Sequence, residues 1–317
     1  MTGNDIGFAA QKLREGALVA IPTETVYGLA ANAFDKEAVT RIFEAKQRPQ
    51  FNPLIVHTSN IERVNSFTTG ISGVLEQLAT TFWPGPLTIL LPRNHMIHPL
   101  VTAGSDFVAV RIPNHPMTLA LLRNLEFPLA APSANLFGRV SPTTAAHVEE
   151  QLGEKVSYIL DGGNCAVGVE STIVKLKNDG VVSILRPGGV SAEMMHPILG
   201  YEPEFSTPQG DRPEAPGMLK SHYAPKIPLV LGEVAAMLEK YKQQRVCLIT
   251  FSEGIAHSSV IRNIILSGRG DLHEAAQQLF SALHEAENED VEIIIAERVP
   301  EIGIGIAIND RLERASA

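Results

Sequence analysis

Residues 43–57 read FEAKQRPQFNPLIVH, and they join the end of a predicted helix to the start of a predicted strand. Lys46 and Arg48 lie two residues apart at the helix end, and an apolar strand closing on His57 follows. Cations at a helix C-terminus stabilise it modestly through its dipole. Arg48 precedes Pro49, however, and a residue before proline is pushed out of helical geometry. The stretch therefore predicts either a helix-end contact or a polyphosphate site built from an arginine fork and a lysine.

Helical and strand patterns alternate around this stretch over the first two hundred residues. Apolar spacing predicts helices over residues 4–15, 36–46, 116–125 and 142–152, with Asp35 capping the second. Segments bounded by proline and glycine predict strands in ALVAIP, PLIVH, PLTILLP, FVAVRIP, PLAAPSAN, YILDGG, ESTIVKL and VVSILRPG. The alternation predicts an α/β fold with a mixed sheet.

The texture changes between residues 201 and 228, which are rich in proline and polar residues and show no sustained period. Such a segment is typical of a linker. Beyond it, RVCLITF, a helix near residues 272–287 and VEIIIAE form a βαβ-like pattern. We expect a first domain over residues 1–205, a linker over 206–228 and a small C-terminal α/β (Rossmann-like) domain over 229–317.

Charge and composition limit the classes of function. The formal net charge is −9, and both halves of the chain carry more acidic than basic residues, which argues against a bulk nucleic-acid binder. No leader peptide or membrane span is expected from the apolar runs. Two cysteines far apart in the chain favour a reduced cytoplasmic protein. An anion site must therefore be local.

Polar residues follow several predicted strands, where ligands of α/β sheets usually bind. Thr23, Glu24 and Thr25 follow the first strand, although hydroxyls there can also satisfy a turn. Ser141 precedes Pro142 and fits a helix N-cap, a position that equally binds phosphate.

Two further segments carry charge. Glu170, Ser171 and Arg186 occur in GVESTIV and ILRPGG. Arg111 lies in an apolar strand and needs an anionic partner, either a carboxylate or a substrate. No Walker loop, GxGxxG fingerprint, metal-spaced cluster or GxSxG elbow occurs, so the chemistry is expected to depend on positioning and charge.

The order of these segments is more specific than any one of them. PTETVYGLA, KQRPQFNPLIVH, WPGPLT, VAVRIPNHP, APSAN, SPT, DGG, VESTIV and LRPG resemble the YrdC-like threonylcarbamoyl-AMP synthases. APGMLKSHYAP and the C-terminal part look like the long, two-domain form of that family. The resemblance covers nearly the whole chain.

The resemblance implies a twisted mixed sheet with flanking helices, whose concave face holds the nucleotide. It implies a nucleotidyltransferase that converts L-threonine, bicarbonate or carbon dioxide, and ATP to threonylcarbamoyl-AMP and pyrophosphate. Magnesium would accompany ATP, with no protein ligand set for the metal. Partner proteins would transfer the threonylcarbamoyl group to the adenosine beside the anticodon of tRNA, and a weak RNA contact is included in the expectation.

The resemblance also assigns residues. Lys46 and Arg48 match the K-x-R that meets the triphosphate and are expected to be catalytic. The nucleotide-binding set comprises Arg48, Asn52, Phe107, Ser133, Ser141 and Arg186, with Lys220, His222 and Tyr223 from a linker that folds over the site. The threonine-binding set comprises Thr25, His57, Arg111, Ser171 and the backbone of Ala131.

Two positions depart from the family pattern, and two other functions compete with the synthase. Many relatives carry threonine at Phe107 and an aromatic residue at Lys220. His57 is the best candidate for a general base. The first alternative is a non-catalytic YrdC-like module that binds RNA. The second is the carbamoyl-adenylate chemistry of hydrogenase-maturation carbamoyltransferases, whose zinc-finger and acyl-phosphatase-like regions have no counterpart in this sequence.

Overall fold

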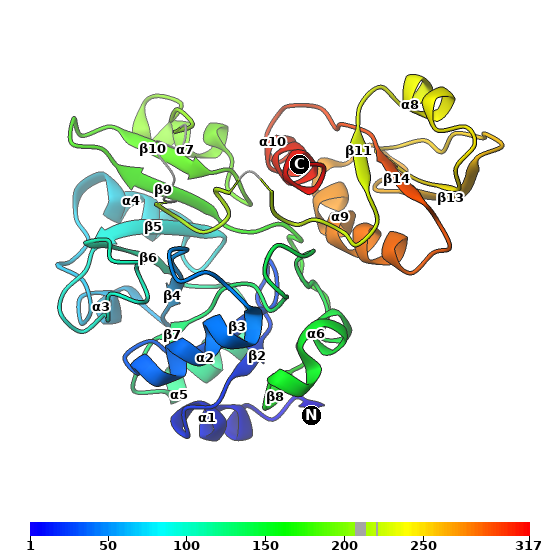
Figure 1. Cartoon of the computed structure of the whole chain (residues 1–317). Coiled ribbons are helices and arrows are strands. Elements are labelled where there is room, and N and C mark those ends of the chain that lie inside the picture. The colour runs from blue at the N-terminus through cyan, green and yellow to red at the C-terminus, as the bar shows by residue number, and fades with distance from the viewer. Residues whose placement is uncertain (207–213, 220) are drawn as a thin grey trace.

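Two β-sheets organise the chain and lie in separate parts of the molecule (Figure 1). The computed structural model describes residues 1–206, 214–219 and 221–317. In these residues the larger sheet has ten strands in the order β1 (Thr2–Gly3), β8 (Tyr158–Leu160), β2 (Val19–Ile21), β3 (Gly28–Asn32), β7 (Leu129–Ala130), β4 (Ile55–His57), β6 (Phe107–Arg111), β5 (Leu87–Pro92), β9 (Thr172–Leu176) and β10 (Val182–Arg186). Parallel and antiparallel pairs alternate irregularly along it, so the predicted mixed sheet is confirmed.

The smaller sheet is parallel throughout its described strands. Their order is β11 (Leu229–Leu231), β14 (Ile293–Ala296), β12 (Val246–Thr250) and β13 (Val260–Ile265). Helices α8 (Val234–Lys240), α9 (Leu272–Glu287) and α10 (Gly305–Ala315) accompany it. A parallel sheet with crossover helices is the expected small α/β unit.

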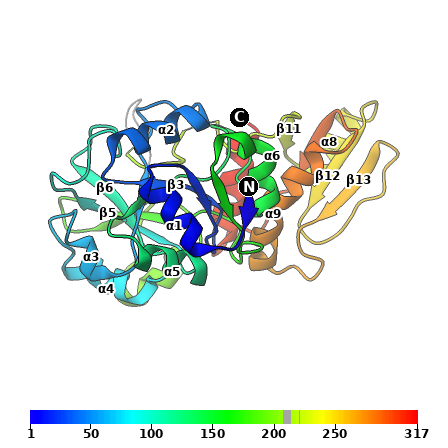
Figure 2. The same cartoon turned by 90° about the horizontal axis from the view of Figure 1, so that it is seen from below.

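The helices of the larger unit cover both faces of its sheet. They are α1 (Ile6–Arg14), α2 (Lys36–Lys46), α3 (Ile61–Val64), α4 (Gly73–Phe82), α5 (Pro116–Asn124), α6 (Ala145–Leu152), the 3₁₀ turn η1 (Gly153–Lys155) and α7 (Ala192–Leu199). Ala20 of β2 packs in the cluster that includes α2, whereas Val19 and Ile21 pack with α1 and α5. Figure 2 shows α2 and α1 on opposite sides of this part of the sheet. The two-residue period of the strand therefore builds two apolar layers.

The same alternation creates a surface that the linker covers. In the other half of the sheet, one strand face packs in the cluster that includes α4 and α7. The opposite face presents Ile55, Leu90 and Ala109, and Ala215 and Met218 of the linker join them in a buried cluster. Ala215 and Met218 of the linker thus lie over one face of the sheet and are held there by apolar contacts.

Helices α9 and α10 connect the two units. Val26, Val140 and Val169 of the larger unit belong to the same buried cluster as the apolar face of α9. The ring of His284 on α9 stacks on that of His147 on α6, with 4.0 Å between the ring centroids, and Figure 2 shows the two helices side by side. The two units therefore share a packed interface.

Most predicted elements form, with shifts at their ends. Asp35 caps α2 as predicted, and Gln47 ends that helix with a φ of 53°, which places Arg48 outside it. The helix predicted from residue 142 starts at Ala145 with Thr144 as its N-cap, so the prediction that Ser141 caps it is wrong. The reason is a tertiary contact. Thr144 accepts a hydrogen bond from the His147 amide, while the Ser141 hydroxyl donates to the Glu170 carboxylate. Among the described residues, no helix combines the length and apolar character that crossing a membrane requires.

Gly168 tests how closely the two units pack. Its φ is +79°, and a Cβ there would lie 2.3 Å from the Gln277 Cα of α9. Gly180 has a φ of +81° in the β9–β10 turn, with nothing within 4 Å of an added Cβ. Gly168→Ala and Gly180→Ala should both lose about 1 kcal/mol of unfolding free energy to the left-handed backbone. Gly168→Ala should lose a further ~1–3 kcal/mol to overpacking.

Urea unfolding of the two variants measures this difference. Equal losses in Gly168→Ala and Gly180→Ala would show that α9 does not lie against Gly168 in solution.

Candidate functional site

Residues from distant segments line one cavity of about 50 Å³ under the linker. The lining includes the whole expected threonine set, Thr25, His57, Arg111, Ala131 and Ser171. It also includes Arg48, Ser133, Arg186, His222 and Tyr223 of the expected nucleotide set. The fold thus brings ten of the predicted residues together at one place.

The remaining predicted residues lie elsewhere. Lys46, Asn52 and Ser141 are buried close to this place but do not line the cavity. Phe107 is exposed at the start of β6, with the Lys175 ammonium 5.4 Å from the centre of its ring. Lys220 lies outside the residues that the structure describes.

Arg111 lies at the end of β6 and makes three contacts. Its Nη2 lies 2.7 Å from the Glu24 carboxylate, out of line for a hydrogen bond. Its Nη1 donates to the Thr25 hydroxyl at 2.9 Å, and its Nε donates to the Gly85 carbonyl. Glu24 is therefore an anionic partner of the kind that the apolar strand required.

The two threonines before β3 have different roles. The Thr23 hydroxyl donates to the Val26 carbonyl at 2.6 Å and accepts from two backbone amides, so it satisfies its own turn. The Thr25 hydroxyl accepts from Arg111 and shares a 2.9 Å hydrogen bond with the Thr23 hydroxyl, and both threonines line the cavity. A turn and a ligand-facing hydroxyl thus occur in the same four residues.

Lys46, Arg48 and Arg186 are buried cations with neutral partners. Lys46 Nζ donates to the carbonyls of Ser133 and Asn135 at 2.6 and 2.5 Å. Arg48 donates to the carbonyls of Asn52 and Pro53. Within the described residues no carboxylate forms an ion pair with any of the three cations.

The burial of these cations shifts their pKa values. It lowers the pKa of Lys46 well below its ordinary value, that of Arg48 to about 9, and that of Arg186 as well. A buried charge without a counterion is costly to the folded state. The site is therefore electrostatically prepared for an anion.

Asn52 adds a second unsatisfied group. Its side chain is fully buried, and neither its amide oxygen nor its amide nitrogen has a partner in the described part of the chain. A buried polar group without a partner costs about 1–3 kcal/mol. A polar ligand atom that reached Asn52 would recover that free energy.

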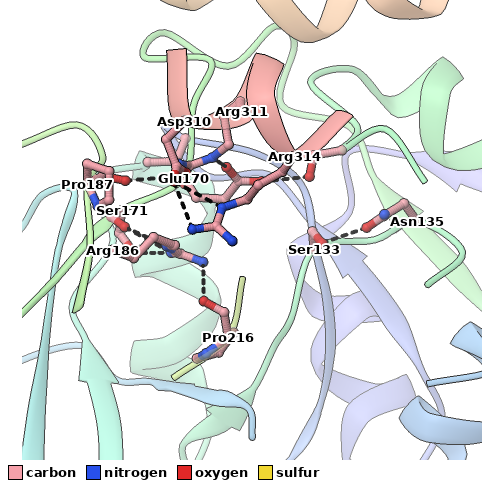
Figure 3. Close-up of polar contacts among 12 residues, drawn as sticks. Ser133, Asn135, Glu170, Ser171, Arg186, Pro187, Pro216, Asp310, Arg311 and Arg314 are labelled. Carbon is pink, nitrogen blue, oxygen red and sulfur yellow. Dashed lines mark hydrogen bonds and ion pairs between the residues drawn. The ribbon is translucent and has the colours of Figure 1, made fainter. Parts of the chain in front are cut away.

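Local packing places Arg186 beside Ser171. A Cβ on Gly188 would lie 2.3 Å from the Glu170 carbonyl oxygen, so only glycine allows this approach. The guanidinium of Arg186 then donates to the Ser171 carbonyl at 2.9 Å and to the Pro216 carbonyl of the linker at 3.1 Å (Figure 3). The LRPG segment thus links β10, the Ser171 turn and the linker.

Sequence reasoning missed Arg311. This residue of α10 is fully buried, and its Nε donates to Glu170 Oε2 at 2.7 Å (Figure 3). INDRLERA resembles an exposed helix with paired charges, which conceals a buried arginine. The available signal was its spacing, because Arg311 lies four residues from both Ala307 and Ala315 on the apolar stripe of α10.

Comparisons with known proteins match nearly the whole chain. A family model described as Telomere recombination (Sua5, YciO, YrdC) matches residues 11–188, and a model of the C-terminal domain of threonylcarbamoyl-AMP synthase matches residues 190–317. The threonylcarbamoyl-AMP synthase of Bacillus subtilis is 40% identical over 98% of this chain and 92% of its own length. The chain belongs to the threonylcarbamoyl-AMP synthase family.

Two further comparisons come from Pyrococcus abyssi. Its threonylcarbamoyl-AMP synthase is 40% identical to this chain, over 98% of this chain and 94% of the relative. The crystal structure of its Sua5 complexed with L-threonine matches with a TM-score of 0.92 and 38% identity, over 100% of this chain and 97% of that one. The family resemblance seen in the ordered motifs and the predicted fold class are both confirmed.

His57 is the family position that we expected to be the best candidate base. Burial first, and then Arg111, lower its pKa to about 3. Its Nδ1 has no partner among the described residues. The imidazole is therefore neutral at physiological pH, and it is a weak base because proton affinity falls with the pKa.

The pKa of His57 predicts a pH dependence of stability. Above pH 6.5 His57 is neutral in both states, and between pH 6.5 and about 3 only the unfolded chain takes up its proton. Between pH 7.5 and 5.5 the wild type should lose about 1.4 kcal/mol more unfolding free energy than His57→Gln. Urea unfolding at the two pH values measures the loss, and equal losses in both proteins would contradict the buried neutral histidine.

Proposed function

We propose that the chain makes threonylcarbamoyl-AMP and pyrophosphate from L-threonine, bicarbonate or carbon dioxide, and ATP. One observation carries the proposal: a single cavity gathers every residue expected for threonine and five of those expected for the nucleotide. The product would serve tRNA modification, with partner proteins that transfer its threonylcarbamoyl group. A cytoplasmic location and a weak RNA contact remain part of this proposal.

The reaction needs an uncharged threonine amine. With carbon dioxide, the nitrogen bonds to the carbon as one C–O π bond breaks, and the amine's proton passes to solvent, which gives a carbamate. With bicarbonate, the new N–C bond replaces the C–OH bond, and the hydroxyl leaves as water with the amine's proton. A carbamate oxygen then attacks the α-phosphorus of ATP, and the bond from that phosphorus to the oxygen bridging to the β-phosphorus breaks, releasing pyrophosphate. Orientation of the reactants can supply about 7–11 kcal/mol of the barrier.

The side chains expected to bind threonine match its chemical groups. Arg111 offers a guanidinium for the carboxylate, since its contact with Glu24 is out of line and its fork is not filled by a bidentate pair. The hydroxyls of Thr25 and Ser171 lie in the same cavity. These groups would hold threonine while its amine reacts.

The unpaired cations suit the triphosphate. Arg48 and Arg186 line the cavity and would stabilise the charge of the leaving pyrophosphate. Lys46 holds the loop of Ser133 and Asn135 through its carbonyls, and its charge adds to the same field. Magnesium would arrive on ATP, because Mg²⁺ is usually held by phosphates with few protein ligands.

The linker would act as a lid over this site. Sites for small molecules usually measure ~300–1,000 Å³, and the cavity of about 50 Å³ is too small for ATP. Pro216, Gly217, His222 and Tyr223 line the cavity from the linker side. With the expected domain limits at residues 205 and 228, this lid would lie between the two units.

The proposal is tested by pyrophosphate release from ATP and Mg²⁺, with and without threonine and bicarbonate. The chain offers a matched control, because Lys12 and Arg14 have the same spacing as Lys46 and Arg48 but lie on the partly exposed end of α1. Lys46→Met/Arg48→Met should lower the rate by about 10²–10³, as expected for lost electrostatic stabilisation of the transition state. Lys12→Met/Arg14→Met should stay within about twofold, because surface ion pairs contribute little.

Each outcome distinguishes a function. Release that needs both threonine and bicarbonate supports the synthase. Release with bicarbonate alone indicates another carbamoylation, and no release under any condition returns the RNA-binding module. Equal losses in the two double variants would remove the triphosphate from Lys46 and Arg48.

A further inference from the structure

Arg311 of α10, in the C-terminal unit, contacts the site in the larger unit. Its Nε donates to Glu170 Oε2 at 2.7 Å and its Nη2 donates to the Pro187 carbonyl at 2.9 Å (Figure 3). Asp310 contacts the third nitrogen. The guanidinium is fully buried and its hydrogen-bond partners lie on two units. Such an arrangement costs much to break, because it leaves a buried charge unpaired.

Glu170 connects Arg311 to Ser141, a residue expected to bind the nucleotide. It lines the cavity, and its Oε1 accepts from the Ser141 hydroxyl at 2.6 Å. The ionisable groups that face it are Arg311 on α10, Arg186 at the end of β10 and Tyr223 of the linker. Burial acts to raise the pKa of Glu170, and the charges of Arg311 and Arg186 together with the hydrogen bonds from Ser141 and Arg311 outweigh it, so the pKa is lowered.

An ionised Glu170 fixes the direction of the Ser141 hydrogen bond. A carboxylate only accepts, and a serine hydroxyl has one hydrogen to donate. The Ser141 oxygen therefore keeps only its lone pairs for any other partner.

Tyr223 is the second group that Arg311 holds. The guanidinium carbon of Arg311 lies 5.2 Å from the centre of the Tyr223 ring. The centre of the Phe280 ring on α9 lies 5.5 Å from the centre of the same tyrosine ring. The backbone of Tyr223 has a φ of 63°, a costly conformation for a residue with a side chain. Stacking between α9 and α10 thus stabilises a strained linker residue at the cavity.

We propose that Arg311 is a positioning residue for ATP, acting on Ser141 through Glu170 and on Tyr223 through stacking. The C-terminal unit thereby takes a direct part in nucleotide binding, and the inference rests on the proposed function. The contacts of Arg311 reach the expected nucleotide set through two segments. None of its hydrogen-bond partners belongs to the expected threonine set.

The end of α10 supports the same inference independently of Arg311. Arg314 donates from Nη1 to the Leu219 carbonyl, and its own carbonyl accepts from the His222 amide at 3.1 Å. The Ser221 hydroxyl donates to the Ala317 carbonyl at 3.0 Å. The linker segment that lines the cavity is therefore hydrogen-bonded along the C-terminal helix.

The test uses the full chain with Arg311→Met, Glu170→Gln and the double variant. Arg262→Met is the control, because Arg262 pairs with Glu285 on the exposed side of the same unit. Calorimetric titration with MgATP and, separately, with L-threonine gives the two dissociation constants. Arg311→Met should bind MgATP at least about tenfold more weakly, the loss of one or two hydrogen bonds. Its threonine affinity should stay within about threefold.

The double variant tests the relay. If Arg311 acts on Ser141 through Glu170, adding Glu170→Gln to Arg311→Met should weaken MgATP binding less than the product of the single effects. The double variant also removes the unpaired buried carboxylate, so it remains measurable if Arg311→Met does not fold.

Three results would overturn the inference. They are unchanged MgATP affinity in Arg311→Met or in the double variant, equal weakening of MgATP and threonine, and an equal effect of Arg262→Met. A wild type that binds neither MgATP nor threonine would instead contradict the proposed function.

Discussion

The burial of Lys46, Arg48 and Arg186 without a carboxylate in the described residues is the constraint on which this site depends. Desolvation of three neighbouring cations opposes folding, and carbonyl oxygens recover only part of that free energy. An anion that binds the folded chain and not the unfolded one stabilises it in proportion to its affinity. The folded chain therefore already holds unpaired positive charge where an anion would bind, and this arrangement is electrostatic preorganisation.

The other two buried arginines of the described residues show the contrast. Arg111 is next to Glu24 and Arg311 is paired with Glu170. Both carboxylates lie in loops beside strands of the larger sheet, Glu24 between β2 and β3 and Glu170 just before β9. The linker contributes neutral groups to the cavity, the Pro216 carbonyl and the rings of His222 and Tyr223.

The sequence predicted what depends on local rules. The end of α2 before Arg48, the residue that precedes proline, its cap at Asp35 and the two-sided alternation of the strands follow from backbone sterics and period alone. The start of α6 did not, because Ser141, Thr143 and Thr144 all suit an N-cap and only the tertiary contact with Glu170 removes Ser141 from that role. Arg311 was missed for a related reason, since its partner lies 141 residues away in the chain. The order of the motifs in the sequence predicted the cavity residues, whereas the roles of Ser141 and Arg311 depend on tertiary packing.

The field of the site also bears on the missing general base. Burial, followed by the neighbouring cations, lowers the pKa of His222 well below its ordinary value, and it lowers those of His57 and Lys46 in the same direction. Each of these groups is shifted toward its neutral form, because nearby positive charge and desolvation both disfavour a cation. A threonine amine bound among Arg48, Arg111 and Arg186 would experience the same two effects. In the proposed reaction these two effects would favour the uncharged amine, the form that captures carbon dioxide.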